Sequence, residues 1–149
     1  MRYMVLMIPK VYQSGAAEGQ DPGFAPDPEA VKRMTEYNER LARSGALIAL
    51  DGLRPPADAA RVSFTGGKPV VTDGPFAEAK EVLGGYWVIQ AGSREEAVEW
   101  ARQCPADEGD VIEVRQIFDV EDMPEETQAA AKNDAVERAG GGHRRARGK

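Results

Sequence analysis

Val71-Thr-Asp-Gly-Pro-Phe-Ala-Glu-Ala-Lys-Glu-Val-Leu-Gly-Gly-Tyr-Trp87 joins the end of one predicted strand to the start of the next. Within it, Asp73-Gly74-Pro75-Phe76 predicts a sharp chain reversal, because glycine accepts unusual dihedral angles and proline fixes its own φ while restricting the residue before it. Phe76 then places a large apolar group directly after the turn, where other side chains must cover it. The stretch is therefore either a candidate functional site or a rigid corner of the fold.

Strands are predicted around this turn from apolar runs that are bounded by turn residues. They cover residues 2–8, 46–53, 61–64, 69–72, 86–90 and 111–118. Residues 2–8 are apolar on both faces, which is typical of a central strand that is covered on both sides. Thr65-Gly-Gly-Lys68 places glycines between two of the strands and predicts a hairpin.

Helices are predicted between the strands from their end signals and from apolar residues at helical spacing. The first begins at Asp27-Pro28-Glu29, an N-cap followed by a first-turn proline and an acidic residue, and it ends at Ser44-Gly45. The second begins with the capping box Ser93-Arg-Glu-Glu96. Its predicted buried stripe consists of Ala97, Trp100, Ala101 and Cys104.

The order of these elements is β-α-β, a hairpin insertion and a second β-α-β. Two such halves predict an α+β fold, the ferredoxin-like βαββαβ arrangement, in which both helices lie on one face of an antiparallel sheet. We expect residues 1–119 to form this domain. Residues 120–149 predict a C-terminal helical extension that starts near Pro124, followed by a basic and flexible tail.

Composition limits the function classes. The chain has 149 residues, of which 42% are hydrophobic and 30% charged, as expected for one globular domain. No apolar run approaches the roughly 20 residues that span a membrane, and the apolar N-terminus indicates a strand rather than a signal peptide. The single cysteine, Cys104, is typical of a protein in the reducing cytoplasm.

Charge argues against a nucleic-acid partner. The formal net charge is −6, and the last seven residues carry four basic side chains, so the rest of the chain carries −10 (−6 minus 4). An acidic body of this kind is not expected to attract nucleic acid over its main surface. We also predict no metal and no cofactor, because the sequence contains neither a histidine or cysteine cluster nor a phosphate-binding glycine motif.

Asp73 is the candidate catalytic residue. If the turn holds it partly buried beside Phe76 and Tyr86, its pKa would rise, which is the condition for a general base near neutral pH. Alternatively, its carboxylate accepts hydrogen bonds from backbone amides of its own turn. Phe76 and Tyr86 are candidate ligand-binding residues, and Tyr86 either belongs to the core or lines a cavity with its hydroxyl group.

Glu113 and Arg115 are further candidates for ligand binding. They share one face of the last predicted strand, whereas Ile112, Val114 and Phe118 share the other. The charged pair forms either an ion pair at a dimer interface or the polar floor of a pocket, and both alternatives remain open.

The stretch from Val71 to Tyr86 resembles the YCII-related proteins, and among them the subgroup named for its Asp-Gly-Pro-Phe motif. The resemblance covers about residues 2–118 and includes Ala97-Val-Glu-Trp100 and Ile112-Glu-Val-Arg115. It implies ferredoxin-like protomers that pair through their sheets as a dimeric α/β barrel, with a pocket between sheet and helices. Among such relatives are proteins similar to enzymes of small aromatic or lactone chemistry, and others encoded beside extracytoplasmic-function sigma factors.

The resemblance also implies a histidine and aspartate pair as the acid/base machinery of the family's enzymes. The one histidine of this chain, His143, lies beyond the matched region, so only Asp73 carries over. Two functions follow. The favoured one is a homodimer that binds a small organic ligand or acts in regulation, linked to sigma-factor systems. The alternative is a cofactor-independent lyase, isomerase or hydrolase of a small organic substrate, with Asp73 as acid/base and Tyr86 or Arg115 orienting the substrate.

Overall fold

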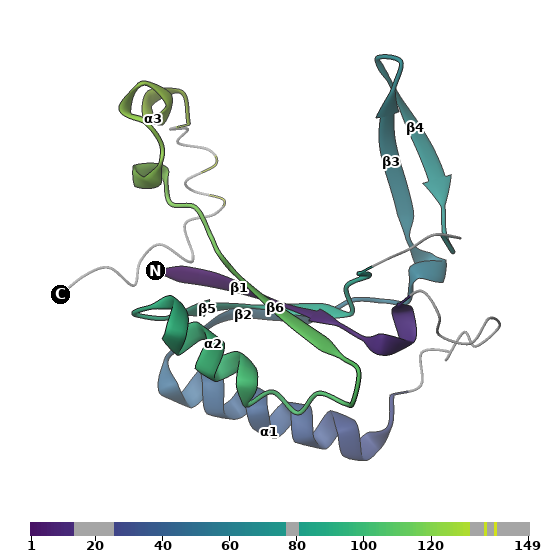
Figure 1. The fold of residues 1–149 in the computed structure, drawn as a ribbon, viewed down its shortest axis with the longest axis vertical. Helices are drawn as coiled ribbons and strands as arrows, with labels where there is room; N and C mark the ends of the chain where they lie inside the picture. Colours follow the sequence, from purple (N-terminus) through teal and green to yellow (C-terminus); the bar gives the residue numbers. More distant parts are fainter. Residues whose placement is uncertain (14–25, 77–80, 132–135, 137–138, 140–149) are drawn as a thin grey trace.

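Among the described residues, four strands form one antiparallel sheet, and two helices cover one of its faces (Figure 1). The computed structural model describes residues 1–13, 26–76, 81–131, 136 and 139. The sheet contains β1 (Arg2–Ile8), β2 (Leu47–Gly52), β5 (Gly85–Gln90) and β6 (Val111–Gln116), in the order β2-β5-β1-β6. The first strand is therefore central, as predicted, and β2 and β6 are the edge strands.

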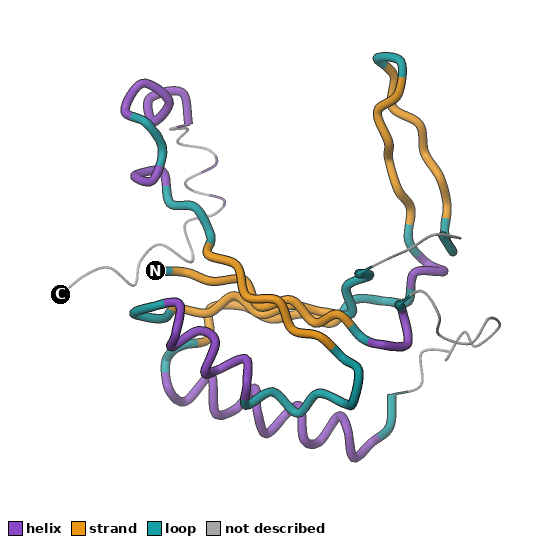
Figure 2. The backbone as a smooth tube through the Cα atoms, in the orientation of Figure 1, coloured by secondary structure: helices purple, strands orange, loops and turns teal. Residues whose placement is uncertain are grey.

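The remaining elements surround this sheet. The two covering helices are α1 (Pro28–Ser44) and α2 (Arg94–Arg102), while β3 (Ala60–Thr65) and β4 (Lys68–Asp73) form a separate hairpin (Figure 2). The short helices are η1 (Lys10–Tyr12), η2 (Pro56–Asp58), η3 (Val120–Asp122) and α3 (Glu125–Ala131). The predicted α+β class is confirmed, and the strand order is consistent with a ferredoxin-like arrangement. Within the described part of the chain, no helix is long and apolar enough to cross a membrane.

Local signals explain where the two covering helices begin and end. The Asp27 carboxylate accepts a hydrogen bond from the Ala30 amide at 3.0 Å, and Gly45 ends α1 with a φ of 78°. Ser93 Oγ accepts from the Glu96 amide at 3.2 Å. The Glu96 carboxylate, however, accepts from the amide of Gly92 at 2.7 Å, one residue before the position that a capping box would use.

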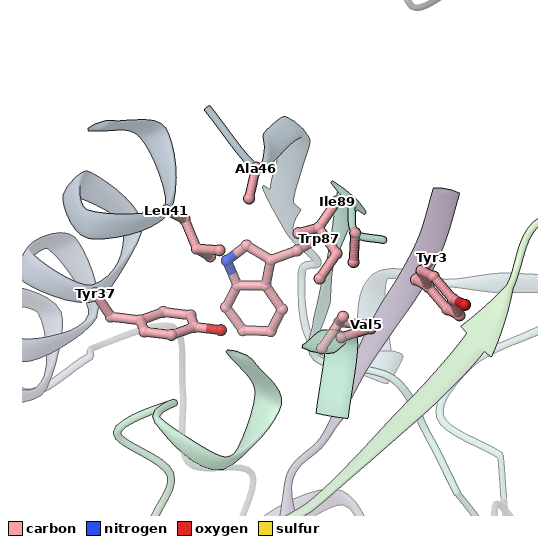
Figure 3. Packing of buried hydrophobic residues seen from close by; sticks show 9 residues of the cluster. Tyr3, Val5, Tyr37, Leu41, Ala46, Trp87 and Ile89 are labelled. Carbon is pink, nitrogen blue, oxygen red and sulfur yellow. The ribbon is translucent and has the colours of Figure 1, made fainter. Parts of the chain in front are cut away.

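The core lies between the sheet and α1. Figure 3 shows Tyr37 and Leu41 of α1 pointing toward Trp87 of β5. The Tyr37 and Trp87 rings meet edge to face, with centroids 5.8 Å apart and an interplanar angle of 86°. The polar group of each ring side chain forms a hydrogen bond. Trp87 Nε1 donates to Asn38 Oδ1 at 2.8 Å, and the Tyr37 hydroxyl donates to the Trp100 carbonyl at 3.0 Å. The core therefore ties α1 to both β5 and α2.

Two expectations about the sheet are corrected. Phe118 does not join Ile112 and Val114 on the core face but is 74% exposed. The reason is that β6 ends at Gln116 and the last sheet bond runs from the Ile117 amide to the Arg2 carbonyl, so the chain leaves the sheet before Phe118. The predicted cover on both faces of β1 is confirmed only in part: both helices lie on one face, whereas on the other face Leu6 and Ile8 are buried and Met4 is half-buried.

Two segments project from the uncovered face of the sheet, one at each end (Figures 1 and 2). One is the β3–β4 hairpin, residues 60–73. The other, which we call the C-terminal arm, runs from residue 117 through η3 and α3 to residue 131. The sheet face between the hairpin and the C-terminal arm carries Met4 and Leu6. The register places Met4 beside Val88, and Leu6 between Tyr86 and Glu113. The predicted helix beyond residue 131 and the basic tail lie almost wholly outside the described residues.

Candidate binding site at the Asp-Gly-Pro-Phe turn

The Asp-Gly-Pro-Phe turn is pressed against the segment that enters the hairpin. The Gly74 amide donates to the Ala59 carbonyl at 2.7 Å, and a Cβ atom on Gly74 would lie 2.0 Å from the Pro56 carbonyl oxygen. Gly74 does not have a positive φ, and the peptide bond to Pro75 is cis. Glycine is thus required here for space between two backbones and not, as the sequence suggested, for an unusual φ.

A cleft of about 450 Å³ opens beside this turn. Its apolar walls are formed by Leu53, Pro55, Pro56, Phe76, Val82 and Leu83. Charged side chains also line it, and two of them, Arg54 and Asp58, bind each other through a contact of 2.8 Å between Nε and Oδ2. Mixed apolar walls with a few polar groups are the composition expected of a small-molecule site.

Arg61 is a second basic side chain that lines the cleft. Its guanidinium carbon lies 3.9 Å from the centroid of the Phe76 ring, a cation–π contact. Within the described part of the chain, Arg61 forms no ion pair with a carboxylate. The cleft therefore contains a guanidinium group that lies over an aromatic ring and forms no ion pair with a described carboxylate, although Asp58 and Glu81 also line the cleft. Sequence patterns contained no signal for Arg61, because it lies 15 positions before Phe76 and only the hairpin brings the two together.

Asp73 lies at the edge of this arrangement. Its side chain is exposed, so the expected partial burial beside Phe76 and Tyr86 is wrong. Nor does its carboxylate accept a hydrogen bond from any described residue, which leaves the alternative of a self-bonded turn without support. It ends β4, directly before the glycine that touches the wall of the cleft. Its catalytic role stays a prediction.

Tyr86 lies on the uncovered face of the sheet and not in the core. Its hydroxyl donates to Asp51 Oδ2 at 2.9 Å. This bond, together with the negative charge of Asp51, raises the pKa of Tyr86. Asp51 was not singled out from the sequence, although its position in an apolar strand was a signal. Asp51 and Tyr86 are also among the residues that line a separate cavity of about 160 Å³ between α1 and the sheet, together with Met34 and Trp87.

Glu113 and Arg115 pair with each other on edge strand β6. Arg115 Nε lies 3.5 Å from Glu113 Oε1, and both side chains are well exposed. An exposed pair of this kind stabilises the fold by at most about 1 kcal/mol. Glu113 also lines a groove of about 560 Å³ between α2 and β6, together with Val98 and Cys104. The structure therefore separates the candidate residues: Phe76 faces the cleft, whereas Tyr86, Glu113 and Arg115 lie elsewhere on the sheet.

Nucleophile and metal chemistry receive no support from the described residues. Cys104 follows the end of α2 half-buried, and burial, with a smaller effect of the Asp110 carboxylate, raises the pKa of its thiol to about 11. A thiol with such a pKa is almost fully protonated near neutral pH and is a poor nucleophile. Among the described residues, no group of three or more histidine, cysteine, aspartate or glutamate side chains could hold a metal ion.

Comparison with known proteins identifies relatives of the chain and leaves its activity open. The chain is similar to an uncharacterised protein of Rhizobium meliloti (strain 1021), with 33% identity over 76 residues. This alignment covers 51% of the chain and 61% of that relative, so the chain spans about three fifths of the relative's length. The model of the YCII-related domain matches residues 1–121, which include every strand of the sheet, the hairpin and the turn described above. The chain therefore belongs to the family of YCII-related domain proteins.

Proposed function

We propose that the protein is a homodimer that binds a small organic acid in the cleft beside the Asp-Gly-Pro-Phe turn. The observation that carries this proposal is the Arg61 guanidinium group, which stacks on Phe76 in a cleft with apolar walls and forms no ion pair with any described carboxylate. A guanidinium group binds a carboxylate through two parallel charge-assisted hydrogen bonds. The ring holds the guanidinium plane in one orientation, so less conformational freedom is lost when an acid binds.

The apolar walls indicate the rest of the ligand. Pro55, Pro56 and Leu83 present aliphatic surface near the cation, and this surface would cover the body of a small aromatic or unsaturated acid. A fully polar anion such as sulfate would leave these walls in water and gain only the ionic contact. Small aromatic carboxylates are therefore the ligand class that fits the site best.

The dimer is supported by the uncovered face of the sheet. Met4 and Leu6 are apolar side chains on that face, of which Met4 is half-buried and Leu6 is 8% exposed within the single chain. An antiparallel sheet whose second face is apolar is stabilised when a second layer covers it. Pairing of two such sheets is the dimeric α/β barrel that the family resemblance implies, and we propose it for this chain.

Catalysis is the second candidate function, and one contact favours it. Because Gly74 lies against the Pro56 and Ala59 carbonyl groups, the turn that ends with Asp73 and Gly74 cannot move without moving the cleft wall. A carboxylate at this position can exchange protons with a bound substrate while remaining in contact with water. The proposed reaction is then a cofactor-independent lyase, isomerase or hydrolase step with Asp73 as acid/base. A cytoplasmic location and a regulatory role beside sigma factors are further proposals, which rest on the single cysteine and on the family resemblance.

A thermal-shift screen tests the ligand proposal. The ligands are benzoate and other small carboxylates, compared with the matching amides, phenols and lactones, and the proteins are the wild type and Arg61→Gln. At 100 times its dissociation constant, a ligand should stabilise the wild type by about 2.7 kcal/mol. We expect carboxylates to raise the melting temperature of the wild type while the neutral analogues do not, and Arg61→Gln to lose the response.

Controls separate charge from structure in this screen. Arg33→Gln removes an exposed cation of α1 that does not line the cleft, and it should keep the full response. Asp73→Asn should also keep binding if Asp73 acts only in catalysis, and it should lose turnover of any substrate that the screen identifies. Equal stabilisation of wild type and Arg61→Gln by the carboxylates would refute the site.

A further inference from the structure

The outer side of edge strand β6 is open for pairing with another strand. The Ile117 amide donates to the Arg2 carbonyl at 2.9 Å, which sets the alternation of the hydrogen bonds between β6 and β1. Alternate residues of β6 bond to β1, so the backbone groups of Ile112, Val114 and Gln116 point to the free side. Within the described part of the chain, no strand pairs with that side, and these backbone groups form no hydrogen bond.

The edge of β6 lacks the features that commonly protect an open edge. Such features include a bulge, a proline or a lysine in the edge strand. The opposite edge strand, β2, has an irregular register between Leu47 and Ala49. In contrast, β6 pairs with β1 in an unbroken register over Val111–Gln116 and contains neither proline nor lysine. Its edge is therefore regular enough to accept a further strand.

A groove of about 560 Å³ lies beside this edge, between α2 and β6. Ile112, Glu113 and Val114 all line it, and because successive residues of a strand point to opposite faces, the groove reaches the backbone of the edge. Val98, Ile112 and Val114 are apolar side chains that remain half-buried there. A strand added to β6 would cover apolar surface as well as pair the open backbone groups.

The charges of β6 select a second copy of the same strand as the partner. Two copies related by a two-fold axis pair antiparallel, and residues whose backbone points outward must oppose each other. A pair centred on Glu113 sets the two Glu113 side chains against each other, and a pair centred on Arg115 does the same with the two Arg115 side chains. A pair centred on Val114 instead sets Glu113 of each copy opposite Arg115 of the other. Opposite charges across a strand pair are stabilising and like charges are destabilising, so the charges favour the register centred on Val114.

We infer that two copies of the chain join through β6, centred on Val114, into one continuous sheet of eight strands (4 plus 4). In this register Ile112 opposes Gln116 of the other copy and Val114 opposes Val114, so the outward backbone groups of all three residues find partners. The axis is perpendicular to the sheet, so the helices of both copies lie on one face of the joined sheet, as the two covering helices do in the single chain (Figure 1). Glu113 and Arg115 lie on the other face, where their own contact of 3.5 Å extends into an alternating group of four charges.

This contact is separate from the homodimer and the ligand site proposed above. That homodimer uses the uncovered face of the sheet, whereas the present contact uses its edge. Neither Glu113 nor Arg115 lines the cleft that contains Arg61. With both contacts the assembly is a tetramer, and with the edge contact alone it is a dimer.

Charge reversal tests the register, because mixing two variants can undo its effect. Glu113→Arg and Arg115→Glu each oppose like charges across the axis, so each variant alone should pair through the edge about tenfold more weakly or worse. An equimolar mixture brings a copy with two cations against a copy with two carboxylates and should recover the wild-type mass. The double variant Glu113→Arg/Arg115→Glu should recover it without mixing. Sedimentation velocity at micromolar concentration measures the mass of each sample.

Two further variants separate the edge contact from a general effect of charge. Glu39→Arg breaks an exposed ion pair with Arg43 within α1 and should leave the mass unchanged. Gln116→Pro changes no charge and removes an outward amide without removing a bond to β1, and it should weaken the edge contact. Circular dichroism at low concentration should match the wild type for every variant, which shows that the single chain is folded.

The mass of the wild type and the effect of mixing decide the outcome. A mass that each single reversal halves and that mixing restores supports the edge contact, whether the wild type is a tetramer or a dimer. A wild-type dimer that neither reversal changes would overturn the edge contact and leave the proposed homodimer standing. A loss of mass that mixing does not restore would overturn the register centred on Val114. A monomeric wild type would overturn both contacts, and none of these results bears on the binding of carboxylates beside Arg61.

Discussion

Replacement of Tyr37 by phenylalanine removes one hydrogen bond from the centre of the fold and changes little else. Tyr37 is 1% exposed, and its hydroxyl donates to the Trp100 carbonyl at 3.0 Å, which joins α1 to α2. After the change, the Trp100 carbonyl still accepts a bond from the Gln103 amide at 3.2 Å, so no buried acceptor is left without a partner. The ring contact with Trp87 is kept. We therefore expect a loss of about 1 kcal/mol in the free energy of unfolding.

Urea denaturation at one fixed protein concentration measures this loss, and Tyr3→Phe is the matched control. Tyr3 is 2% exposed, but its hydroxyl donates only to Met1 Sδ at 3.6 Å. Because a thioether is a weak acceptor, the control should lose about 0.5 kcal/mol or less, with an unchanged m-value in both variants. An equal loss in the two variants would refute the assignment of the stabilisation to the bond between the helices.

The same hydroxyl group makes stability depend on pH. Burial raises the pKa of Tyr37 above its ordinary value, with a smaller contribution from Cys104. The folded state therefore keeps the proton at a pH where the unfolded chain loses it. The stabilisation is complete below the unfolded value of about 10 and is lost as the pH rises above it. Tyr37→Phe should show a weaker loss of stability above pH 10 than the wild type, and parallel curves would contradict this reasoning.

The remaining predictions concern the turn and the thiol. Gly74→Ala should lower the melting temperature and remove the response to carboxylates, because its Cβ would lie 2.0 Å from the Pro56 carbonyl oxygen, whereas Gly52→Ala, which meets nothing within 4 Å, should do neither. Equal melting temperatures for the two variants would contradict the close approach. Since burial raises the pKa of Cys104 from 9.0 to about 11, iodoacetamide at pH 8 should alkylate it roughly a hundredfold more slowly than an unperturbed thiol. The rate should still rise above pH 10, and a rate that levels off near that pH would show that the thiol is not perturbed.

The elements of the fold could be predicted because their signals are local. Asp27 and Gly45 mark the ends of α1 through their own backbone and side-chain bonds, and Thr65-Gly-Gly-Lys68 marks the hairpin through two glycines with positive φ. The central place of β1 followed from apolar residues on both of its faces. Phe118 was assigned wrongly to the core face of the last strand. Apolar residues continue past Gln116 in the sequence, but the pairing of β6 with β1 ends there.

The candidate site could be predicted only in part. The sequence drew attention to the turn and to Phe76, which does line the cleft. It could not show that Arg61 stacks on Phe76, that Asp73 is exposed, or that Asp51 accepts a hydrogen bond from Tyr86. Each of these facts depends on which strands pair and in which register, and a change of register by one residue would turn every side chain to the other face.

The sequence by itself thus determined the helices, the strands, the hairpin and the family, because periodicity, caps and a long motif are properties of consecutive residues. The tertiary structure alone decided which charges share a surface. Arg61 meets Phe76 only after β3 and β4 have paired and the turn has closed on Pro56 and Ala59. The proposed ligand site is a product of contacts between segments, and those contacts form only when the chain folds.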